Sequence, residues 1–219
     1  MESIIQILPE LNQAFFETLL MVGIALLTAL LVGLPLGILL FVTDRGIFLE
    51  NKFIRQTAGS IINLIRSVPY VILLVFLLPF THFLLNTTIG PLAASVSLSV
   101  AAIPFYARIA ESAAREIDKG VIEAAVAAGA SPWLIIKDII LPESKAGLIR
   151  GLTITAISLI GYSAMAGTIG GGGIGDLAIR YGYYRYDNTI MFTTVILLIV
   201  LVQVVQYFGD FIAKAVSRR

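Results

Sequence analysis

Cysteine is absent from this 219-residue chain, and histidine occurs once, at His82. Without cysteine the chain can form no disulfide and offers no thiolate as nucleophile or metal ligand. A single histidine also excludes a metal site built from several imidazoles. The sequence therefore predicts no metal site and no thiol chemistry, and it leaves the redox compartment of the protein open.

Charged residues are scarce as well, at 13% of the chain, whereas apolar residues reach 58% and the mean hydropathy is +0.94. An ordinary soluble domain is about a quarter charged and about half apolar, so this excess of apolar residues favours lipid as the solvent. The net charge is only +1, with both signs spread through the polar segments. No basic face is offered to nucleic acid, which we exclude as a partner.

A helix needs about 20 apolar residues to cross the hydrocarbon core of a bilayer. Three stretches free of Asp, Glu, Lys and Arg predict one span each, and a longer stretch divides into two at the turn-forming "THFLLNTTIGP". The expected spans cover 18–43, about 67–80, about 92–110, 151–175 and 188–209. Because we find neither an internal repeat nor a long linker, we expect an all-α polytopic membrane protein with five transmembrane helices and a single membrane domain over 1–219.

Lys and Arg flank these spans unevenly, and cytoplasmic loops are the ones enriched in them. Neither residue precedes the first span, so the N-terminus lacks the positive region of a cleaved signal peptide, and we expect the first apolar segment to be retained. The count favours an N-terminus outside and a C-terminus in the cytoplasm. The predicted cytoplasmic side carries Arg45, Lys52, Arg55, Arg108, Arg115, Lys119, Lys137, Lys145, Arg150, Lys214, Arg218 and Arg219, against Arg180 and Arg185 on the other side.

The segment 118–142, on the predicted cytoplasmic side, has the capping pattern of two short helices joined by a tight turn. Asp118 can cap the first helix, and Gly129 suits the left-handed conformation that ends it. Ser131 can cap the second helix. We expect Pro142 to end that helix, because the residue before a proline is disfavoured in the helical region.

Alanine dominates the first of these two helices, with four of them between 124 and 128. Such a helix has little side-chain bulk and could enter a groove on another protein. A loop helix that merely covers the bundle explains the same pattern equally well, because alanine-rich helices are common and stable.

A longer pattern runs through the same segment: E-A-A, three residues, G, nine residues, I, one residue and L-P. It resembles in full the E-A-A motif in permease subunits of bacterial ATP-binding-cassette (ABC) importers. In that family the segment is a cytoplasmic coupling helix, which seats in a cleft of a separate ATPase subunit. The resemblance implies that Glu123, Ala124, Ala125 and Gly129 line this contact and that Leu141 and Pro142 return the chain to the bilayer.

Three further stretches are similar to the methionine-uptake branch of that family, and the likeness extends over essentially the whole chain: "RSVPYVILLVFLLPFT", "IPFYAR" and "GYSAMAGTIGGGGIGDLAIRYGY". This likeness implies a homodimer, two ATPase subunits on the cytoplasmic side, and a methionine-binding lipoprotein or periplasmic protein on the other. It also implies a multi-pass protein of the bacterial cytoplasmic (inner) membrane that moves methionine by alternating access and does no covalent chemistry.

Acidic residues are missing from the interior of every predicted span, and Glu17 stands only at the edge of the first. Ion-coupled secondary transporters usually need ionisable groups inside their spans, so this absence favours energy supplied by another chain. The chain has no P-loop, since "GTIGGGGIGD" lacks the G-K-[ST] ending that places a lysine on phosphates. We therefore expect ATP and magnesium on the partner ATPase and no cofactor here.

Arg66 is a candidate for the transport pathway, because it is the one basic residue embedded in apolar sequence. If its helix begins near Thr57, the charge lies well inside the bilayer, where charges are costly and usually functional. If the span begins at Ser67, the side chain reaches the cytoplasmic surface. We favour this arrangement, or pairing of the guanidinium with a phosphate or a neighbouring carbonyl. Contact with a substrate carboxylate is the alternative role.

Tyr162, Ser163 and Met165 are further candidates for the pathway or its gate, mid-way along the fourth predicted span. An unbranched methionine side chain is flexible and polarisable, so such residues could surround the substrate or close behind it. Packing of small residues between helices explains the same stretch.

Six glycines between 167 and 175 end the fourth predicted span, and a tight turn explains them most simply. The following "DLAIRYGYYRYD" places Asp176 and Arg180 one helical turn apart. Its four tyrosines are typical of an aromatic belt, with contact to a binding protein as the alternative.

Three other functions stay open: an ABC permease for another small amino acid or solute, an ion-coupled secondary transporter, and a membrane scaffold without transport. Uptake competition among amino acids separates the first from methionine transport. A protonophore would abolish uptake by the second, and deletion of the third would leave methionine uptake unaltered.

Overall fold

Helices dominate the structure, because backbone groups in lipid must find their hydrogen bonds within the chain. The computed structural model describes residues 2–217 and contains no strand within them. Arg218 and Arg219, which enter the charge count above, lie outside the described residues. In chain order the elements are α1 (Glu2–Thr28), η1 (Ala29–Gly33), α2 (Leu34–Val42), α3 (Lys52–Ser67), α4 (Tyr70–Phe76), α5 (Leu78–Leu85), α6 (Pro91–Arg115), α7 (Lys119–Ala127), α8 (Pro132–Ile135), η2 (Ile136–Ile140), α9 (Leu141–Gly167), α10 (Gly173–Leu177), η3 (Ala178–Tyr183) and α11 (Asn188–Ser217).

Four helical runs are long and apolar enough to cross a membrane: Ile7–Val42, Pro91–Arg115, Pro132–Gly167 and Asn188–Ser217. α3 and α4 are each too short to cross a membrane alone and pass the same test only as a pair, with a bend of 101° between them. The expected total of five spans is reached when this bent pair counts as one.

The bounds of the second span differ from the prediction, which placed it over about 67–80. The helix begins at Lys52 and ends at Ser67. Val68 then adopts an extended conformation, with φ −85° and ψ 126°, because Pro69 follows it. α3 carries many polar side chains, so its sequence has the composition of a loop, and a search for uniformly apolar runs misses it.

The prediction that Pro142 ends a helix is wrong. Leu141 keeps helical dihedral angles, with φ −64° and ψ −45°, and the helix continues from Pro132 to Gly167. The physical reason lies in the π-helical turn η2, where the Leu141 N–H bonds to the Ile136 carbonyl five residues earlier. This wider turn accommodates a proline ring that would clash with the carbonyl four residues before it in a regular α-helix.

The first span contains the same arrangement. η1 stands just before Pro35, and the Leu34 N–H bonds to the Ala29 carbonyl, again five residues earlier. A π-helical turn thus carries both of these prolines within a continuous helix.

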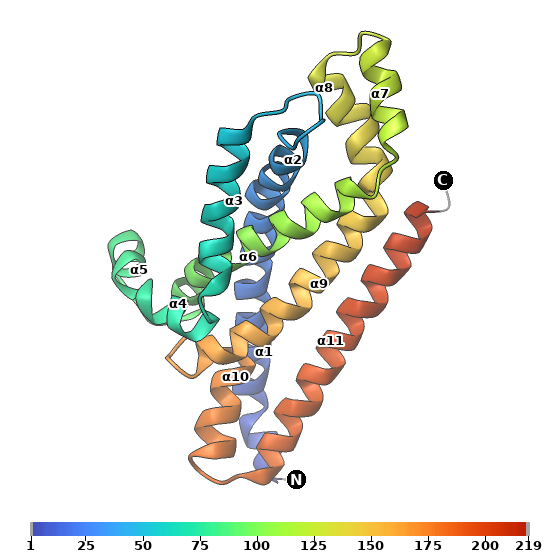
Figure 1. Cartoon of the computed structure of the whole chain (residues 1–219). Helices are drawn as coiled ribbons and strands as arrows, with labels where there is room; N and C mark the ends of the chain where they lie inside the picture. Colours follow the sequence, from blue (N-terminus) through green and yellow to red (C-terminus); the bar gives the residue numbers. More distant parts are fainter. Residues whose placement is uncertain (1, 218–219) are drawn as a thin grey trace.

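α6 lies at the centre of the bundle, in contact with α1, α2, α3 and α9 (Figure 1). Its Leu98 and Tyr106 side chains are almost completely buried in the main core. Gly33 and Gly37 let α2 approach closely, because a Cβ at these positions would lie 2.8 and 2.4 Å from carbonyl oxygens of α6. Two glycines four residues apart share one helix face, as at close helix contacts in membranes.

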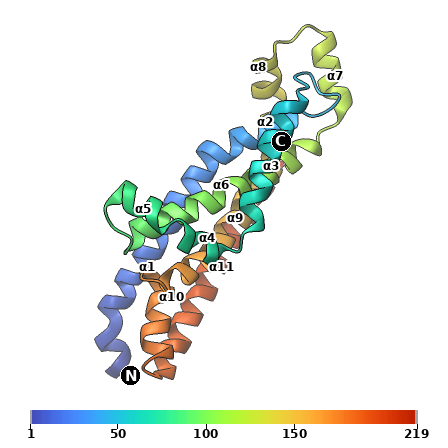
Figure 2. The ribbon, with the colours of Figure 1, turned by 60° about the vertical axis from the view of Figure 1, so that its left-hand side comes forward.

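The bundle is elongated, and its two ends differ (Figures 1 and 2). α7, α8 and the loop over 43–51 lie at one end together with the last turns of α11, and we call this the α7 end. The start of α1 and the turn between η3 and α11 lie at the opposite end, with Arg180 and Arg185.

We expect Gly37→Ala to lower the thermal stability of the protein in detergent, because the new methyl group would press on the Ala107 carbonyl and the Ala110 side chain of α6. Overpacking of this kind costs about 1–3 kcal/mol. The control is Gly23→Ala, since a Cβ there meets nothing within 4 Å and alanine favours a helix. Unfolding midpoints that fall equally in both variants would contradict the close packing of α2 on α6.

Candidate functional site

Side-chain caps shape the segment 118–142 as the sequence predicts. Asp118 accepts a hydrogen bond (2.8 Å) from the backbone N–H two residues on, and so begins α7. Ser131 accepts one (3.4 Å) from the N–H three residues on, at the start of α8. Gly129 between them has φ +79°, a conformation that favours glycine. The resulting α7–α8 hairpin projects beyond α2 at the α7 end (Figure 1).

The α7–α8 hairpin is anchored on one side and open on the other. Its buried side places isoleucines 122 and 135, together with Ile140 of η2, in one cluster with Phe41 and Val42 of α2 and Ala114 of α6. The residues that the E-A-A resemblance assigns to the ATPase contact lie mostly on the open side: Glu123, Ala124 and Gly129 are exposed, and Ala125 is half-buried. Leu141 is half-buried and Pro142 exposed, both in the continuous helix rather than at its end.

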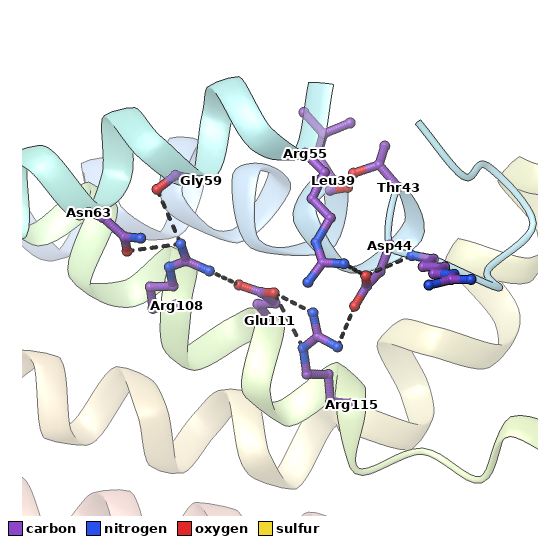
Figure 3. A network of polar contacts seen from close by, with 10 residues as sticks. Leu39, Thr43, Asp44, Arg55, Gly59, Asn63, Arg108, Glu111 and Arg115 are labelled. Atoms are coloured by element: carbon purple, nitrogen blue, oxygen red, sulfur yellow. Dashed lines mark hydrogen bonds and ion pairs between the residues drawn. The ribbon is translucent and has the colours of Figure 1, made fainter. Parts of the chain in front are cut away.

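A network of ion pairs that the sequence analysis did not foresee lies beside this anchor (Figure 3). Glu111 of α6 is buried, with 4% of its surface exposed, and its two oxygens accept from two guanidiniums of the same helix. Arg108 donates at 2.6 Å and Arg115 at 2.7 Å. Arg108 also reaches α3, donating to the Gly59 carbonyl at 3.2 Å and to the Asn63 amide oxygen at 2.9 Å.

Asp44 extends the network to the loop after α2. Its carboxylate is also buried, with 7% exposed, and it pairs with Arg55 of α3 and with Arg115 of α6. Two buried carboxylates are thus shared among three arginines, and the network joins the loop after α2 to α3 and α6 at the α7 end (Figure 3). Losing one partner would leave a buried charge uncompensated.

Part of this network could have been found in the sequence. Arg108, Glu111 and Arg115 follow the spacing of three and four residues that pairs opposite charges on one helix face. The sequence analysis counted Arg108 and Arg115 only as basic residues between the third and fourth spans and did not pair them with Glu111. No local spacing points to Asp44, whose partners lie on two other helices.

Tyr162, a pathway candidate, is held at the α3–α4 bend. Its ring stacks on Tyr70 at 4.7 Å between centroids, with 11° between the planes. The Tyr70 hydroxyl lies 3.1 Å from the Ser97 hydroxyl of α6, and the two share a hydrogen bond. Tyr162 therefore ties α9 to the start of α4.

The other three pathway candidates lie in different surroundings. Ser163 is buried and donates to the Ile160 carbonyl of its own helix at 2.8 Å. Met165 keeps 42% of its surface exposed. Arg66 is exposed in the last turn of α3. The helix that carries it begins at Lys52, about 21 Å away along the axis, rather than beside Arg66. The depth of Arg66 in the bilayer stays a prediction.

The glycine run after α9 forms a tight turn, as predicted, with positive φ at Gly170, Gly172 and Gly173. Glu17 of α1 accepts a hydrogen bond from the Gly173 N–H at 2.8 Å, and the neighbouring Thr18 hydroxyl accepts from the Ile174 N–H at 3.0 Å. Glu17 thus lies within the long helix α1 and joins it to the glycine turn.

Charged and aromatic groups gather at the same end of the bundle. The predicted pairing of Asp176 with Arg180 is confirmed, with 2.7 Å between Oδ2 and Nε. The Tyr181 hydroxyl donates to the Glu10 carboxylate at 2.8 Å, which connects η3 with α1. This hydrogen bond to a carboxylate raises the pKa of the Tyr181 hydroxyl.

Within residues 2–217, no group of three or more His, Cys, Asp or Glu side chains lies close enough to hold a metal ion. His82 lies exposed on α5. The site is therefore described by surfaces and ion pairs.

A family model described as "Binding-protein-dependent transport system inner membrane component" matches residues 33–219. A protein of Vibrio cholerae, "Probable D-methionine transport system permease protein MetI", is 47% identical over 206 residues, which cover 94% of this chain and 92% of that one. The "Methionine import system permease protein MetP" of Bacillus subtilis is 44% identical over 212 residues, 97% of this chain and 96% of that one. A solved chain of the "MetNI methionine ABC transporter" in an inward-facing conformation matches with TM-score 0.95 and 43% identity, over 96% of this chain and 98% of that one.

We expect Glu111→Gln to lower the unfolding midpoint of the purified protein by several degrees, because Arg108 and Arg115 would lose the carboxylate they share. Breaking a fully buried ion pair costs about 3–5 kcal/mol, and the loss here should be smaller because the side chains of Arg108 and Arg115 are 26% and 41% exposed. The control is Glu116→Gln, one helical turn away and exposed. A double variant that also carries Arg115→Gln should lose less than the sum of the two single variants. Additive losses, or equal effects at residues 111 and 116, would count against the network.

Proposed function

Because the chain belongs to the family of binding-protein-dependent transport system inner membrane components, we propose that it is the permease subunit of an ATP-driven ABC importer that moves methionine across the bacterial cytoplasmic membrane by alternating access. Its likeness to methionine permeases over nearly its whole length carries this proposal: relatives 44–48% identical are named for methionine transport. As a transport component the chain is not an enzyme.

The transporter would contain two copies of this chain and two ATPase subunits, with a methionine-binding lipoprotein or periplasmic protein on the outer side. ATP and magnesium would bind to the ATPase subunits, since this sequence lacks the lysine and hydroxyl residue of a P-loop. The exposed, alanine-rich side of α7 supports the ATPase contact, because a helix with such small side chains fits deeply into a groove.

Closure of the ATPases would reach the membrane helices through two connections. The first is the continuous run Pro132–Gly167, which leads from the α7–α8 hairpin into the bundle without a break. The second is the apolar cluster that packs Ile122 and Ile135 against Phe41 of α2. A helix moves as a stiff rod over this length, so a displacement at the hairpin would shift α9 as a whole.

The orientation that fits this proposal has the N-terminus outside and the α7 end in the cytoplasm. The uneven distribution of Lys and Arg supports it, and an ATPase in the cytoplasm requires it. Among the pathway candidates, exposure supports Arg66 and Met165, whereas Tyr162 would act by holding the α3–α4 bend and Ser163 by packing.

An ion-coupled secondary transporter is the rival within membrane proteins. Of the carboxylates within the long helical runs, only Glu17 and Glu111 are not exposed, and both accept hydrogen bonds or ion pairs within this chain. A carboxylate that carries a proton or sodium ion must be free to exchange its partners, so these engaged groups favour ATP as the energy source.

The deciding measurement is uptake of labelled methionine by proteoliposomes that contain the permease, its cognate ATPase and its binding protein. We expect uptake that requires ATP, resists a protonophore and is competed by unlabelled methionine better than by other amino acids. Uptake without the ATPase would overturn the importer, and stronger competition by a different amino acid would overturn methionine as the substrate.

We expect Ala124→Trp to abolish co-purification of the ATPase while leaving the permease folded, because the exposed indole would block the seat of α7 without disturbing the core. The control is Thr189→Trp, an exposed position at the opposite end of the bundle. The readout is the ratio of ATPase to permease after affinity purification, with at least a tenfold loss expected for Ala124→Trp alone. Normal co-purification and uptake in that variant would remove α7 from the contact.

A further inference from the structure

Glycines let the turn after α9 lie directly against α1. A Cβ at Gly172 would lie 2.5 Å from a carboxylate oxygen of Glu17, and a Cβ at Gly173 would lie 2.7 Å from the Thr18 hydroxyl oxygen. Both distances are shorter than a side chain tolerates, so only glycine, which has no Cβ, allows this approach. The backbone of the turn is therefore within reach of the polar side chains of α1.

Two of those side chains cap α10. Its own N-cap residue, Gly172, has no side chain with which to bind the free N–H groups of the first turn. Glu17 accepts from the Gly173 N–H and Thr18 from the Ile174 N–H instead, each 156 residues away in the sequence. The cap of α10 is thus a tertiary contact that ties this helix to α1.

The same turn is bound to the start of α6. The backbone N–H of Gly90, the residue before α6, donates to the Gly170 carbonyl at 2.8 Å. Both glycines have positive φ, +96° and +87°, which favours glycine on each side of this hydrogen bond. α1, α6, α9 and α10 therefore meet at one place. We call it the glycine joint, and it consists of Glu17, Thr18, Gly90 and the turn over 167–174.

The glycine joint closes a long loop of chain that carries the α7–α8 hairpin at its far end (Figure 1). α6 leads from the joint to the α7 end as Pro91–Arg115, and the run Pro132–Gly167 leads back from the hairpin to the joint. A hydrogen bond of 3.2 Å from the Tyr106 hydroxyl to the Leu148 carbonyl connects the two helices between these ends. Because helices are rigid elements, a displacement of the hairpin reaches the joint along two paths.

We infer that Glu17 is a positioning residue for transport: it keeps the glycine joint closed through the transport cycle, so that α1 and η3 follow α6 and α9 when the hairpin moves. Without its carboxylate, the Gly173 N–H loses its acceptor and α9 can shift against α1. ATPase closure would then move the α7 end without moving the opposite end in step. The inference rests on the proposed function, because it takes an ATPase to drive the hairpin.

A gate that opens during transport is the other role that a glycine-rich turn could have. Opening this turn would break the hydrogen bonds of Gly173 and Ile174 to α1, and it would expose the Ile174 side chain, which is completely buried. Buried N–H groups that lose their partners are costly. These contacts favour a joint that stays closed.

The first test loosens the joint. Glu17→Ala removes the carboxylate, whereas Glu17→Gln keeps a carbonyl oxygen for the Gly173 N–H. Thr18→Val removes the other acceptor with little change of shape. Its matched control is Thr28→Val, because the Thr28 hydroxyl also donates within α1, to the Ala25 carbonyl at 2.9 Å. Each variant is reconstituted with the cognate ATPase and binding protein, and methionine uptake and ATP hydrolysis are measured in the same proteoliposomes.

We expect the ATP hydrolysed per methionine imported to rise at least fivefold in Glu17→Ala and at least threefold in Thr18→Val. The ratio should stay near that of the unaltered transporter in Glu17→Gln and Thr28→Val. A residue that served only stability would lower assembly, uptake and hydrolysis together and leave the ratio unchanged. An unchanged ratio in both Glu17→Ala and Thr18→Val would therefore overturn the inference, and if Glu17→Ala fails to assemble, the isosteric Thr18→Val decides.

The second test locks α1 to η3. Cysteines replace Glu10 and Tyr181, whose side chains meet across these elements at 2.8 Å, in a chain that has no other cysteine. A bifunctional methanethiosulfonate bridges the pair, and a monofunctional reagent on both cysteines is the control. We expect the bridged transporter to import methionine at the rate of the control. A block by the bridge alone, reversed by a reductant, would overturn the inference by showing that α1 and η3 separate during transport.

The unaltered transporter is measured in parallel, because the inference and the proposed function can fail separately. Uptake without the ATPase would refute the proposed function itself. ATP-dependent uptake with an unchanged ratio in the variants would refute only the role of Glu17.

Discussion

Two buried carboxylates shared among three arginines hold the α7 end of the bundle together. α3 buries only Gly59 and Ile62, which gives it little hydrophobic attachment to its neighbours. Its position therefore depends on polar contacts, from Arg55 to Asp44 and from Arg108 to Gly59 and Asn63. Because the buried carboxylates of Asp44 and Glu111 would be costly without partners, the network favours one position of α3 against α2 and α6.

The same end receives the α7–α8 hairpin. Its isoleucines share an apolar cluster with Phe41 and Ala114, which are close in sequence to the ion-paired Asp44 and Glu111. A force on the hairpin would thus reach α2, α3 and α6 together. η2 extends this connection to α9, since the π-helical turn lets the chain pass Pro142 as a continuous helix. The π-helical turn accommodates the proline locally, and α9 continues beyond it as a helix.

The sequence predicts the all-helical class, five spans, the caps of the segment 118–142, the tight glycine turn and the Asp176–Arg180 pair. Each of these depends on local composition or on spacing within one helix. It does not predict α3, because the polar side chains of this helix interrupt the apolar run by which a span is recognised. It also misses Asp44, whose partners lie on other elements, and it misjudges Pro142, where a change of hydrogen-bond register overcomes the local preference before proline. Tertiary contacts decide all three.

α3 is held at both ends, and this gives it a particular part in transport. An ion pair from Arg55 ties its first turns to Asp44 in the loop after α2, and a hydrogen bond from Arg108 of α6 to the Gly59 carbonyl holds its middle. Beyond the bend at its other end, Tyr70 stacks on Tyr162 of α9 and shares a hydrogen bond with Ser97 of α6. α3 therefore cannot shift alone: it follows α6 and α9, the helices that the hairpin would drive.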